Sequence, residues 1–523
     1  MVRLTRSRLD VAAACGLAAI AAAYVSWVLG GREHIYEDAA MLFRYAAHLA
    51  GGHGIVWNVG DAPLDGGTDF AFLIALAVLH RTGLSIEHAA SLLGVAAHAA
   101  TVVLVYWTIV RRGHDRLAAG ASALYLAVGP AKAYVAAGFG TAVFAFGVAV
   151  AWTIALEWAD SPDRTHGARF GAAVVAMGIC RPEGVLLGAL MAAGVIVCSR
   201  PSRAALVAFL STATILGGAF FAARWWYFGA PLPNPYYKKG GFALHWDSFR
   251  ASLKYGVLLG GPFWLALAAG FTSPATWRRA ALAAIPACGF IASWILLSNE
   301  MNFFRRFQYP MLPLLLMSWP DVVAPLRHRF SEMWASFGTV PRRVAVAAMS
   351  VTVAAILAYQ HATYMPPLWE DGADELGRML APYRDRGYAM AVSEAGVLPF
   401  YSGWYAIDTW GLNDRWIARH RGISSEYLDR RKPELIAFHA QVPLASARPT
   451  DEWMQMDVAL QRYASSRSYT LAGQFGSTPD NTTYYYVRED VHDSGSITRV
   501  IRDWASRHRF TNFAAADDDT GFF

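Results

Sequence analysis

Charged residues are scarce in this chain of 523 residues: Asp, Glu, Lys and Arg make up 16% of it, whereas hydrophobic residues make up 55%. Soluble globular domains carry about 25% charged residues. This deficit and a mean hydropathy of +0.28 exclude an ordinary soluble protein and indicate a membrane protein. The net charge of +6 comes mainly from arginines between apolar runs, a pattern typical of membrane topology. Because no basic patch with interleaved aromatic residues occurs, we expect membrane lipids and no nucleic acid as partners.

Cysteine is also rare, and all four copies lie inside or at the ends of apolar segments: Cys15, Cys180, Cys198 and Cys288. The polar C-terminal third has none, which excludes a disulfide framework there. Paired CxxC cysteines, an HExxH motif and a cluster of histidines are all absent from the sequence. We therefore expect neither a dedicated zinc site nor a resident cofactor, and the need for another divalent metal ion stays open.

Apolar runs long enough to cross a membrane, about 17–25 residues, recur over the first 360 residues. They lie near 9–30, 86–110, 116–130, 136–157, 166–180, 184–198, 204–226, 254–271, 280–297, 309–325 and 343–360. The first run is longer than the core of a signal peptide, so we interpret it as a retained anchor helix. The run 70–80 is too short to span, and we place it at the membrane interface.

The loops between these runs indicate the orientation of the chain. With the N-terminus in the cytoplasm, every inside loop is basic, as the positive-inside rule requires. Counting 70–80 as a span would put Arg111 and Arg112 outside and break this pattern. We therefore predict a polytopic α-helical membrane domain at 1–364, with about eleven spans and a cytoplasmic N-terminus.

The character of the chain changes after Tyr364 and becomes polar. Residues 365–513 are predicted to form an extracytoplasmic mixed α/β domain, and residues 514–523, with three consecutive Asp, a disordered tail. We expect helices at 369–383, 451–465 and 496–508, strands at 389–392 and 484–487, and a turn rich in Gly and Tyr at 395–405.

The stretch Tyr36–Phe70 follows the first span and lies within the predicted outer loop 31–85. It opens with the paired acids Glu37 and Asp38 on a short predicted helix, followed by Arg44 and His48 one turn apart. Glycines then end this helix, and a polar loop continues through Asn58, Asp61, Asp65 and Asp69. Because the stretch should lie at the membrane surface, we predict that it forms one half of an active site there.

Transfer of a sugar from a polyprenyl phosphate needs a carboxylate that accepts the proton of the acceptor hydroxyl, cations that hold the departing phosphate, and a groove for the lipid. Asp38, with Glu37 beside it, can supply the carboxylate. The cations that can contact the phosphate on the outer side are Arg181, Lys238, Lys239, Arg305 and Arg306.

Each of these groups also has a structural explanation. The two acids are favourable at any helix N-terminus. Arg181 and Glu183 can close a hairpin as a local ion pair, and Arg305 and Arg306 can anchor a span at the interface. Tyr236 and Tyr237 fit an aromatic belt better than a sugar platform.

The stretch from Glu37 to Phe70 resembles the first outer loop of GT-C glycosyltransferases of the mycobacterial terminal arabinofuranosyltransferase (AftB) type. Further matches follow in the same order: CRPEGVLL (180–187), YFGAPLPNPYYKK (227–239), RFQYPMLPLL (306–315), SEAGVLPFYSG (393–403), DTWGLND (408–414) and KPELI (432–436). The resemblance implies a GT-C fold, a donor such as decaprenyl-phosphoryl-arabinofuranose, and Asp38 at the reaction centre. Substrate contacts are then expected within the matching segments from Arg44, His48, Asn58, Asp65, Glu183, Asn234, Tyr236, Tyr237, Glu394 and Asp408.

Two positions depart from the pattern of that family. Its first acid is usually Asp and is Glu37 here, and the segment Gly138-Phe-Gly140-Thr141 lacks an acid that related sequences carry at position 140. Flagellar-motor-associated (ZomB-like) membrane proteins share the same motifs.

From the resemblance, the expected function is transfer of a sugar, arabinofuranose in our prediction, to a glycan or protein acceptor of the envelope, in a bacterial inner membrane. The alternatives are a non-catalytic membrane scaffold and a lipid or sugar transporter.

Overall fold

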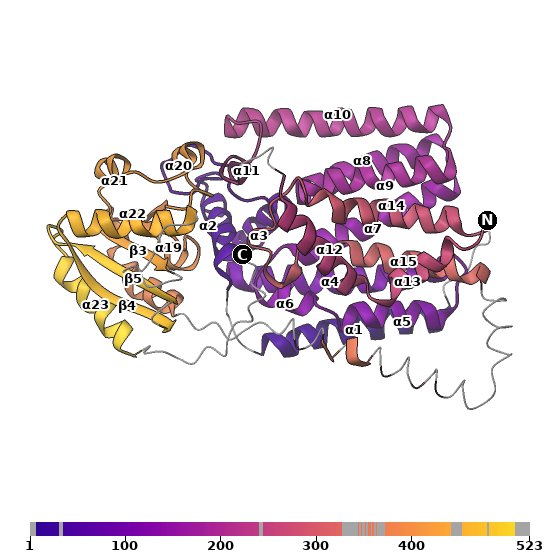
Figure 1. The fold of residues 1–523 in the computed structure, drawn as a ribbon, viewed down its shortest axis with the longest axis horizontal. Coiled ribbons are helices and arrows are strands. Elements are labelled where there is room, and N and C mark those ends of the chain that lie inside the picture. Colours follow the sequence, from indigo (N-terminus) through magenta and orange to yellow (C-terminus); the bar gives the residue numbers. More distant parts are fainter. Residues whose placement is uncertain are drawn as a thin grey trace.

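The computed structural model describes residues 7–30, 35–239, 244–326, 372–440, 452–478 and 481–507, with scattered residues between 344 and 362. A bundle of roughly parallel helices forms most of it, and a smaller mixed α/β unit covers one end of the bundle (Figure 1). Two short helices, α2 (Glu37–Ala50) and α3 (Phe70–Arg81), lie at the junction. The other helices of this part are α1 (Arg8–Leu29), α4 (Ile86–Arg111), α5 (Arg116–Ala127), α6 (Ala131–Ala136), α7 (Thr141–Asp160), α8 (Arg164–Cys180), α9 (Glu183–Ser199), α10 (Arg203–Phe228), α11 (Asn234–Lys238), α12 (Trp246–Gly260), α13 (Pro262–Gly270), α14 (Trp277–Ser293) and α15 (Met311–Val323). This arrangement confirms the predicted fold class.

Small polar residues and glycines set the ends of the long helices. Ser7 and Ser202 accept backbone N–H groups at the starts of α1 and α10, as N-cap residues do. Gly30 and Gly229 end the same two helices with φ of 51° and 66°, the left-handed conformation that glycine adopts without strain. A sharper break lies between α12 and α13, which are bent by 91°.

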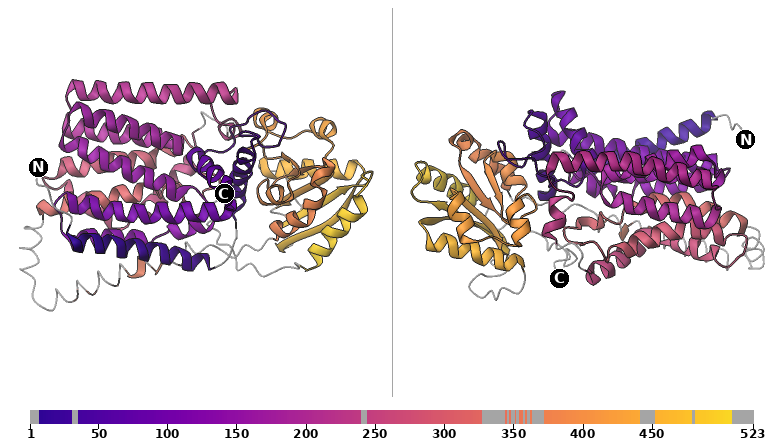
Figure 2. Two further views of the ribbon diagram at one scale, coloured as in Figure 1. Left: turned by 180° about the vertical axis from the view of Figure 1, so that it is seen from behind. Right: turned by 90° about the horizontal axis from the view of Figure 1, so that it is seen from above.

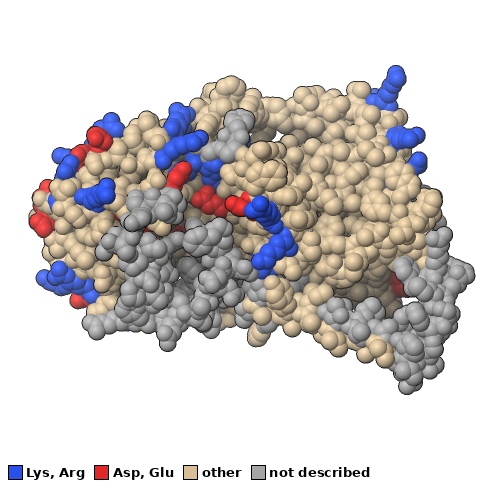
Figure 3. Space-filling view, viewed as in Figure 1, with Lys and Arg blue, Asp and Glu red and all other residues tan. Residues whose placement is uncertain are grey.

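Within the described residues, four helices, α1, α4, α7 and α10, are long and apolar enough to cross a membrane, and the bent pair α12–α13 would make a fifth. The side view of the surface agrees: charged side chains gather on the α/β unit, and the visible face of the bundle is almost free of them (Figure 3). Helix α3 has 12 residues, which confirms that the run 70–80 is too short to span. The count of eleven spans stays a prediction, and the predicted run 343–360 lies almost wholly outside the described residues.

Ion pairs close the end of the bundle that lies away from the α/β unit. Arg116 pairs with Asp10 at the start of α1 (2.6 Å), and Arg112 pairs with Asp321 near the end of α15 (2.8 Å). Helix α1 runs from this end toward the junction, where α2 begins (Figure 2). Gly52, just after α2, and Gly113, between the two paired arginines, therefore lie at opposite ends of the bundle.

We expect single cysteines at these two positions to react on opposite faces of the membrane. A membrane-impermeant maleimide added to intact cells should label Gly52→Cys and should label Gly113→Cys only after permeabilisation. The native cysteines must first be replaced, because Cys15 and Cys288 are exposed on the bundle. Labelling of Gly113→Cys in intact cells would contradict the predicted topology.

The α/β unit is built on one five-stranded sheet with the order β2-β1-β3-β5-β4. Strand β1 is parallel to β2 and β3, whereas β5 is antiparallel to β3 and β4. The strands are β1 (Ala389–Val392), β2 (Tyr405–Asp408), β3 (Leu435–Ala440), β4 (Tyr469–Thr478) and β5 (Asn481–Arg488), and the helices are α18 (Ala373–Leu380), α19 (Val397–Ser402), α20 (Arg415–His420), α21 (Ser425–Arg431), α22 (Glu452–Ser466) and α23 (Ser494–Arg507).

Most predicted elements of this unit agree with the observed ones. Strand β1 has the predicted residues, and α22 and α23 begin within two residues of the predicted starts. The predicted turn 395–405 is wrong in one respect, because it contains the short helix α19. Its first N–H groups are accepted by Glu37 of the bundle, a partner that no local sequence pattern reveals. The predicted tail 514–523 lies outside the described residues.

Candidate active site

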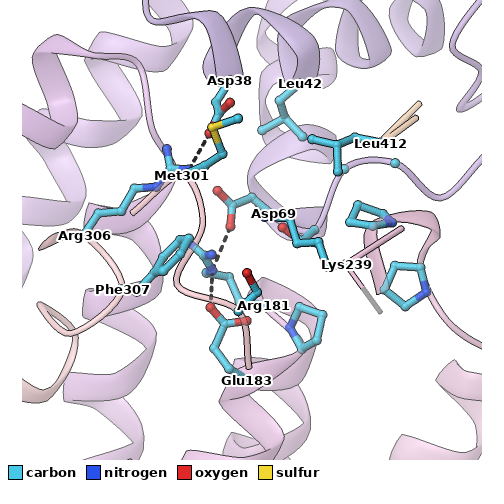
Figure 4. Close-up of a pocket in the computed structure, with 18 of the residues that line it drawn as sticks. Asp38, Leu42, Asp69, Arg181, Glu183, Lys239, Met301, Arg306, Phe307 and Leu412 are labelled. Carbon is cyan, nitrogen blue, oxygen red and sulfur yellow. Dashed lines mark hydrogen bonds and ion pairs between the residues drawn. The ribbon is translucent and has the colours of Figure 1, made fainter. Parts of the chain in front are cut away.

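A pocket of about 270 Å³ opens at the junction between the bundle and the α/β unit. Its walls come from the start of α2, the loop before α3, the turn before α7, the start of α9, the region around α11 and the segment 294–307. The α/β unit contributes Leu412, from the segment that follows β2 (Figure 4). Residues that are up to several hundred positions apart in the chain therefore face one cavity.

Asp38 lies in the first turn of α2 and points into this pocket (Figure 4). Its Oδ2 accepts a hydrogen bond of 2.6 Å from Nη2 of Arg306. The Arg306 guanidinium is buried over the ring of Phe139 (3.8 Å), and its Nε makes no hydrogen bond within the described residues. Burial lowers the pKa of Arg306 from its ordinary value, although Asp38 opposes this effect. A further anion beside Arg306 would therefore be favourable.

A second buried guanidinium, that of Arg181, faces the pocket from the turn between α8 and α9. Its Nε lies 2.7 Å from Oε1 of Glu183 and 3.1 Å from Oδ1 of Asp69. The local pair of Arg181 and Glu183 thus exists, and it extends to a third residue from the outer loop. The shortest contact to each acid is made at Nε, and within the described residues no hydrogen bond joins a terminal nitrogen of Arg181 to either acid.

One aromatic ring connects the two arginines. The ring centre of Phe307 is 5.3 Å from the guanidinium carbon of Arg181 and 5.2 Å from that of Arg306. Trp294 stacks on Phe307 with ring centres 4.8 Å apart, which fixes the ring in place. Two cations are therefore held around one apolar ring at the inner wall of the pocket.

The two neighbouring acids of α2 have different partners. Consecutive helix residues point about 100° apart, because a turn has 3.6 residues. Glu37 accordingly turns to the α/β unit, where it accepts hydrogen bonds from the backbone N–H groups of Gly396 and Val397 (3.0 Å for Val397). Gly396 packs so closely on the Glu37 carbonyl that a Cβ would not fit. Glu37, predicted to assist catalysis, here caps α19.

Arg44 joins the outer loop to the α/β unit. It is buried and donates four hydrogen bonds, to the carbonyls of Trp57 (2.8 Å), Pro399 (2.6 Å) and Trp404 (2.7 Å) and to Oδ1 of Asn58 (2.9 Å). Asn58 in turn exchanges two hydrogen bonds with the backbone of Ala406 in β2. Both residues, predicted to contact substrate, are placed between the two units and outside the described lining of the pocket.

We expect Arg44→Met to destabilise the protein by about 3 kcal/mol or more. The substitution removes a donor from four buried acceptors. Asn58 and Pro399 keep a second donor, but the carbonyls of Trp57 and Trp404 lose theirs, and each unsatisfied group costs about 1–3 kcal/mol. Thermal unfolding in detergent, followed by tryptophan fluorescence, measures the loss. Arg502→Met on the exposed face of α23 is the matched control and should unfold like the wild type. Equal unfolding temperatures for both variants would contradict this role of Arg44.

The segments Ser393–Tyr401 and Asp408–Asp414, which carry two of the matching motifs, contact the outer loop through Glu37 and Tyr45. Asn234 of α11 donates to the carbonyls of Gly411 (3.0 Å) and Leu412 (2.9 Å). Asp408 accepts hydrogen bonds from Asn413, and burial raises the pKa of Asp408 to about 6. Asn234 thus holds this segment against the bundle, and Asp408 fixes its backbone conformation.

The other residues predicted to contact substrate or donor divide into two groups. Glu183 and Tyr236 line the pocket. Six others lie outside its described lining. Lys238 forms an ion pair with Glu452 (Nζ to Oε2, 2.7 Å), Asp65 forms one with Arg224, and Nδ1 of His48 lies 3.0 Å from the carbonyl oxygen of Val56. The guanidinium carbon of Arg305 lies 5.0 Å from the ring centre of Tyr255, that of Arg419 lies 5.8 Å from the ring centre of Tyr237, and Glu394 follows β1.

Among the lining residues, Lys239 was predicted as a cation for the phosphate, whereas sequence reasoning gave no role to Asp69 and Phe307. Asp69 and Phe307 lie within segments that were recognised, so only the direction of their side chains was unknown. The described residues contain no group of three or more His, Cys, Asp or Glu side chains placed to hold a metal ion.

Comparisons with known proteins give a fold and a domain match. The family model described as "Domain of unknown function (DUF8728)" matches residues 357–490. No curated protein sequence matches the chain. The structure of ArnT from Cupriavidus metallidurans in the apo state has a TM-score of 0.57 and 13% identity to this chain, over 90% of this chain and 97% of ArnT. The structure of ArnT bound to undecaprenyl phosphate has a TM-score of 0.57 and 12% identity, over the same shares of both chains.

Arabinofuranosyltransferase AftD from Mycobacteria is less similar, with a TM-score of 0.48 and 14% identity over 94% of this chain and 42% of AftD. The likeness to ArnT, at 13% identity, shows the fold alone, and the ArnT alignment covers nearly all of both chains. The chain therefore has the fold of the GT-C glycosyltransferases, as the resemblance of its motifs predicted.

Proposed function

We propose that this chain is a membrane glycosyltransferase that moves a sugar from a polyprenyl phosphate to an acceptor hydroxyl in the junction pocket. The observation that carries the proposal is the shared orientation of one carboxylate, Asp38, and two buried guanidiniums, Arg181 and Arg306, toward one cavity. Chemically, such a set suits an anionic leaving group next to a proton acceptor. The bound undecaprenyl phosphate in the similar ArnT structure supports a lipid phosphate as the donor class.

The reaction follows from these groups. The acceptor hydroxyl oxygen attacks the anomeric carbon of the donor, and the bond between that carbon and the phosphate oxygen breaks. The hydroxyl proton passes to the Asp38 carboxylate, and the electron pair of the broken bond stays on the phosphate. Arg306, which donates to Asp38 in this structure, turns to the phosphate and leaves Asp38 available to the hydroxyl. If the sugar keeps its anomeric configuration, Asp38 instead stabilises positive charge at that carbon.

The acceptor would approach from the α/β unit, because Leu412 and Tyr236 line that side of the pocket. The lipid would lie along the apolar bundle. The motif resemblance favours arabinofuranose as the sugar and a glycan or protein of the bacterial envelope as the acceptor. We place the bundle in the inner membrane, with the N-terminus cytoplasmic and the α/β unit periplasmic.

Purified protein in liposomes tests the proposal. The donors are synthetic polyprenyl phosphates that carry arabinofuranose, another pentose or a hexose, and the acceptor is an arabinofuranosyl oligosaccharide. We expect a longer oligosaccharide and an equal amount of free polyprenyl phosphate from the arabinofuranosyl donor. Binding of the donors without release of polyprenyl phosphate from any of them would contradict the proposal and favour the scaffold.

A further inference from the structure

Asp69 is a lining residue of the pocket to which the proposed reaction gives no role. It precedes α3 in the outer loop, and its carboxylate lies in the pocket beside Arg181, 3.1 Å from Nε (Figure 4). Its Oδ1 is buried and makes no hydrogen bond within the described residues, so the charge of Arg181 is what holds it. A buried carboxylate with so few partners is costly, which argues against an incidental placement.

The space that Asp69 fills depends on a glycine from another part of the chain. A Cβ at Gly140 would lie 3.0 Å from Oδ2 of Asp69 and 2.9 Å from the ring of Phe72. The backbone does not demand glycine here, because Gly140 has φ −70°, which any residue adopts. Glycine is needed because the Asp69 carboxylate and the Phe72 ring occupy the space that a side chain at position 140 would fill.

Gly140 is also the position at which the sequence lacks an acid that its related motifs carry. A side chain at 140 would grow into the volume that Asp69 occupies from the opposite wall. An acidic side chain at 140 and the carboxylate of Asp69 would therefore compete for one volume.

We infer that Asp69 is the positioning carboxylate of the donor site: it holds Arg181 so that the terminal nitrogens of Arg181 meet the donor phosphate, and Gly140 makes room for it. This inference rests on the proposed function. Glu183 holds the same Nε from the start of α9, at 2.7 Å, so the two acids grip Arg181 from two elements. Asp69 acts through Arg181 and does not contact the phosphate itself.

We therefore expect that an acid at position 140 can replace the carboxylate of Asp69. Asp69→Ser keeps a good N-cap residue for α3 and removes the acid. It should weaken binding of undecaprenyl phosphate about tenfold, less than the loss of a whole charge-assisted contact. Gly140→Asp alone places two carboxylates in one volume and should also weaken binding, because like charges at this distance cannot both stay ionised. The double variant should bind within a factor of about three of the wild type.

The measurement is the dissociation constant for undecaprenyl phosphate in nanodiscs, with the unfolding temperature of each variant in parallel. A purely structural role for Asp69 would move the unfolding temperature and would not be rescued by an acid at 140. In an Arg181→Gln background, Asp69→Ser should cause little further loss. Wild-type affinity in Asp69→Ser, or a double variant no tighter than Asp69→Ser, would overturn the inference.

The binding series also separates this inference from the proposed function. If the variants follow the predicted pattern of lipid affinity while the wild type transfers no sugar from any donor, the proposed function fails and the role of Asp69 stands. If the wild type transfers sugar while the affinities of the variants do not follow the pattern, the role of Asp69 is overturned and the function stands.

Discussion

Asp38→Asn should lose most sugar transfer, by about 10²–10⁴-fold, because an amide cannot accept the hydroxyl proton that a general base removes. Binding of the lipid phosphate should persist or become tighter. Arg306 forms an ion pair with Asp38 in this structure, and the substitution removes the negative charge that competes with the phosphate for Arg306. Transfer rate and the dissociation constant for undecaprenyl phosphate, measured on the same preparation, separate these two effects.

Glu37→Gln is the control for this experiment, since it changes the neighbouring acid on the same helix. Glu37 accepts the N–H groups at the start of α19, so its substitution should lower the unfolding temperature and change transfer by only a few fold. Full activity in Asp38→Asn would remove Asp38 from the chemistry. Equal losses in both variants would mean that the N-terminus of α2 has only a structural role.

Arg306→Ala should weaken binding of the lipid phosphate by about 10- to 100-fold, the usual worth of a hydrogen bond to a charged group. The arginine is buried against Phe139, so water cannot readily replace it as a partner of the phosphate. Arg306→Lys should recover part of the affinity, because it restores the charge without the planar fork. Titration of undecaprenyl phosphate into nanodiscs that contain each variant gives the three constants.

The adjacent residue offers a matched control for this substitution. Arg305 is also buried, but it packs on Tyr255 and Tyr359 outside the described lining of the pocket. Arg305→Ala should therefore lower stability and leave the affinity for the lipid phosphate unchanged. Wild-type affinity in Arg306→Ala, or the same loss in Arg305→Ala, would contradict a specific phosphate contact at Arg306.

The parts of the fold that were predicted from sequence depend on local patterns. Apolar runs of sufficient length gave α1, α4, α7 and α10, and a short strand-like segment gave β1. The shift to polar composition after Tyr364 separated the bundle from the α/β unit. Helix α19 was missed because its first turn depends on a carboxylate about 360 positions away in the chain.

The candidate site was predicted in outline, and its details depend on side-chain direction. Glu37 and Asp38 carry the same chemistry in the sequence, and only the rotation of α2 decides that Asp38 enters the pocket. The same holds for Lys238 and Lys239, of which only Lys239 reaches the described lining. The role inferred for Asp69 depends on its distance from Gly140, and a distance between residues so far apart in the chain cannot be read from the sequence.

The most direct measurement is a cryo-electron microscopy structure of the protein with a polyprenyl-phosphoryl-arabinofuranose or a non-transferable analogue. We predict phosphate density between the guanidiniums of Arg181 and Arg306, the sugar ring beside Asp38, and the Arg306–Asp38 pair opened. The lipid should leave the pocket along the bundle and away from the α/β unit. Phosphate density elsewhere, with Arg306 still paired to Asp38 and the junction pocket empty at saturating donor, would contradict the proposed active site.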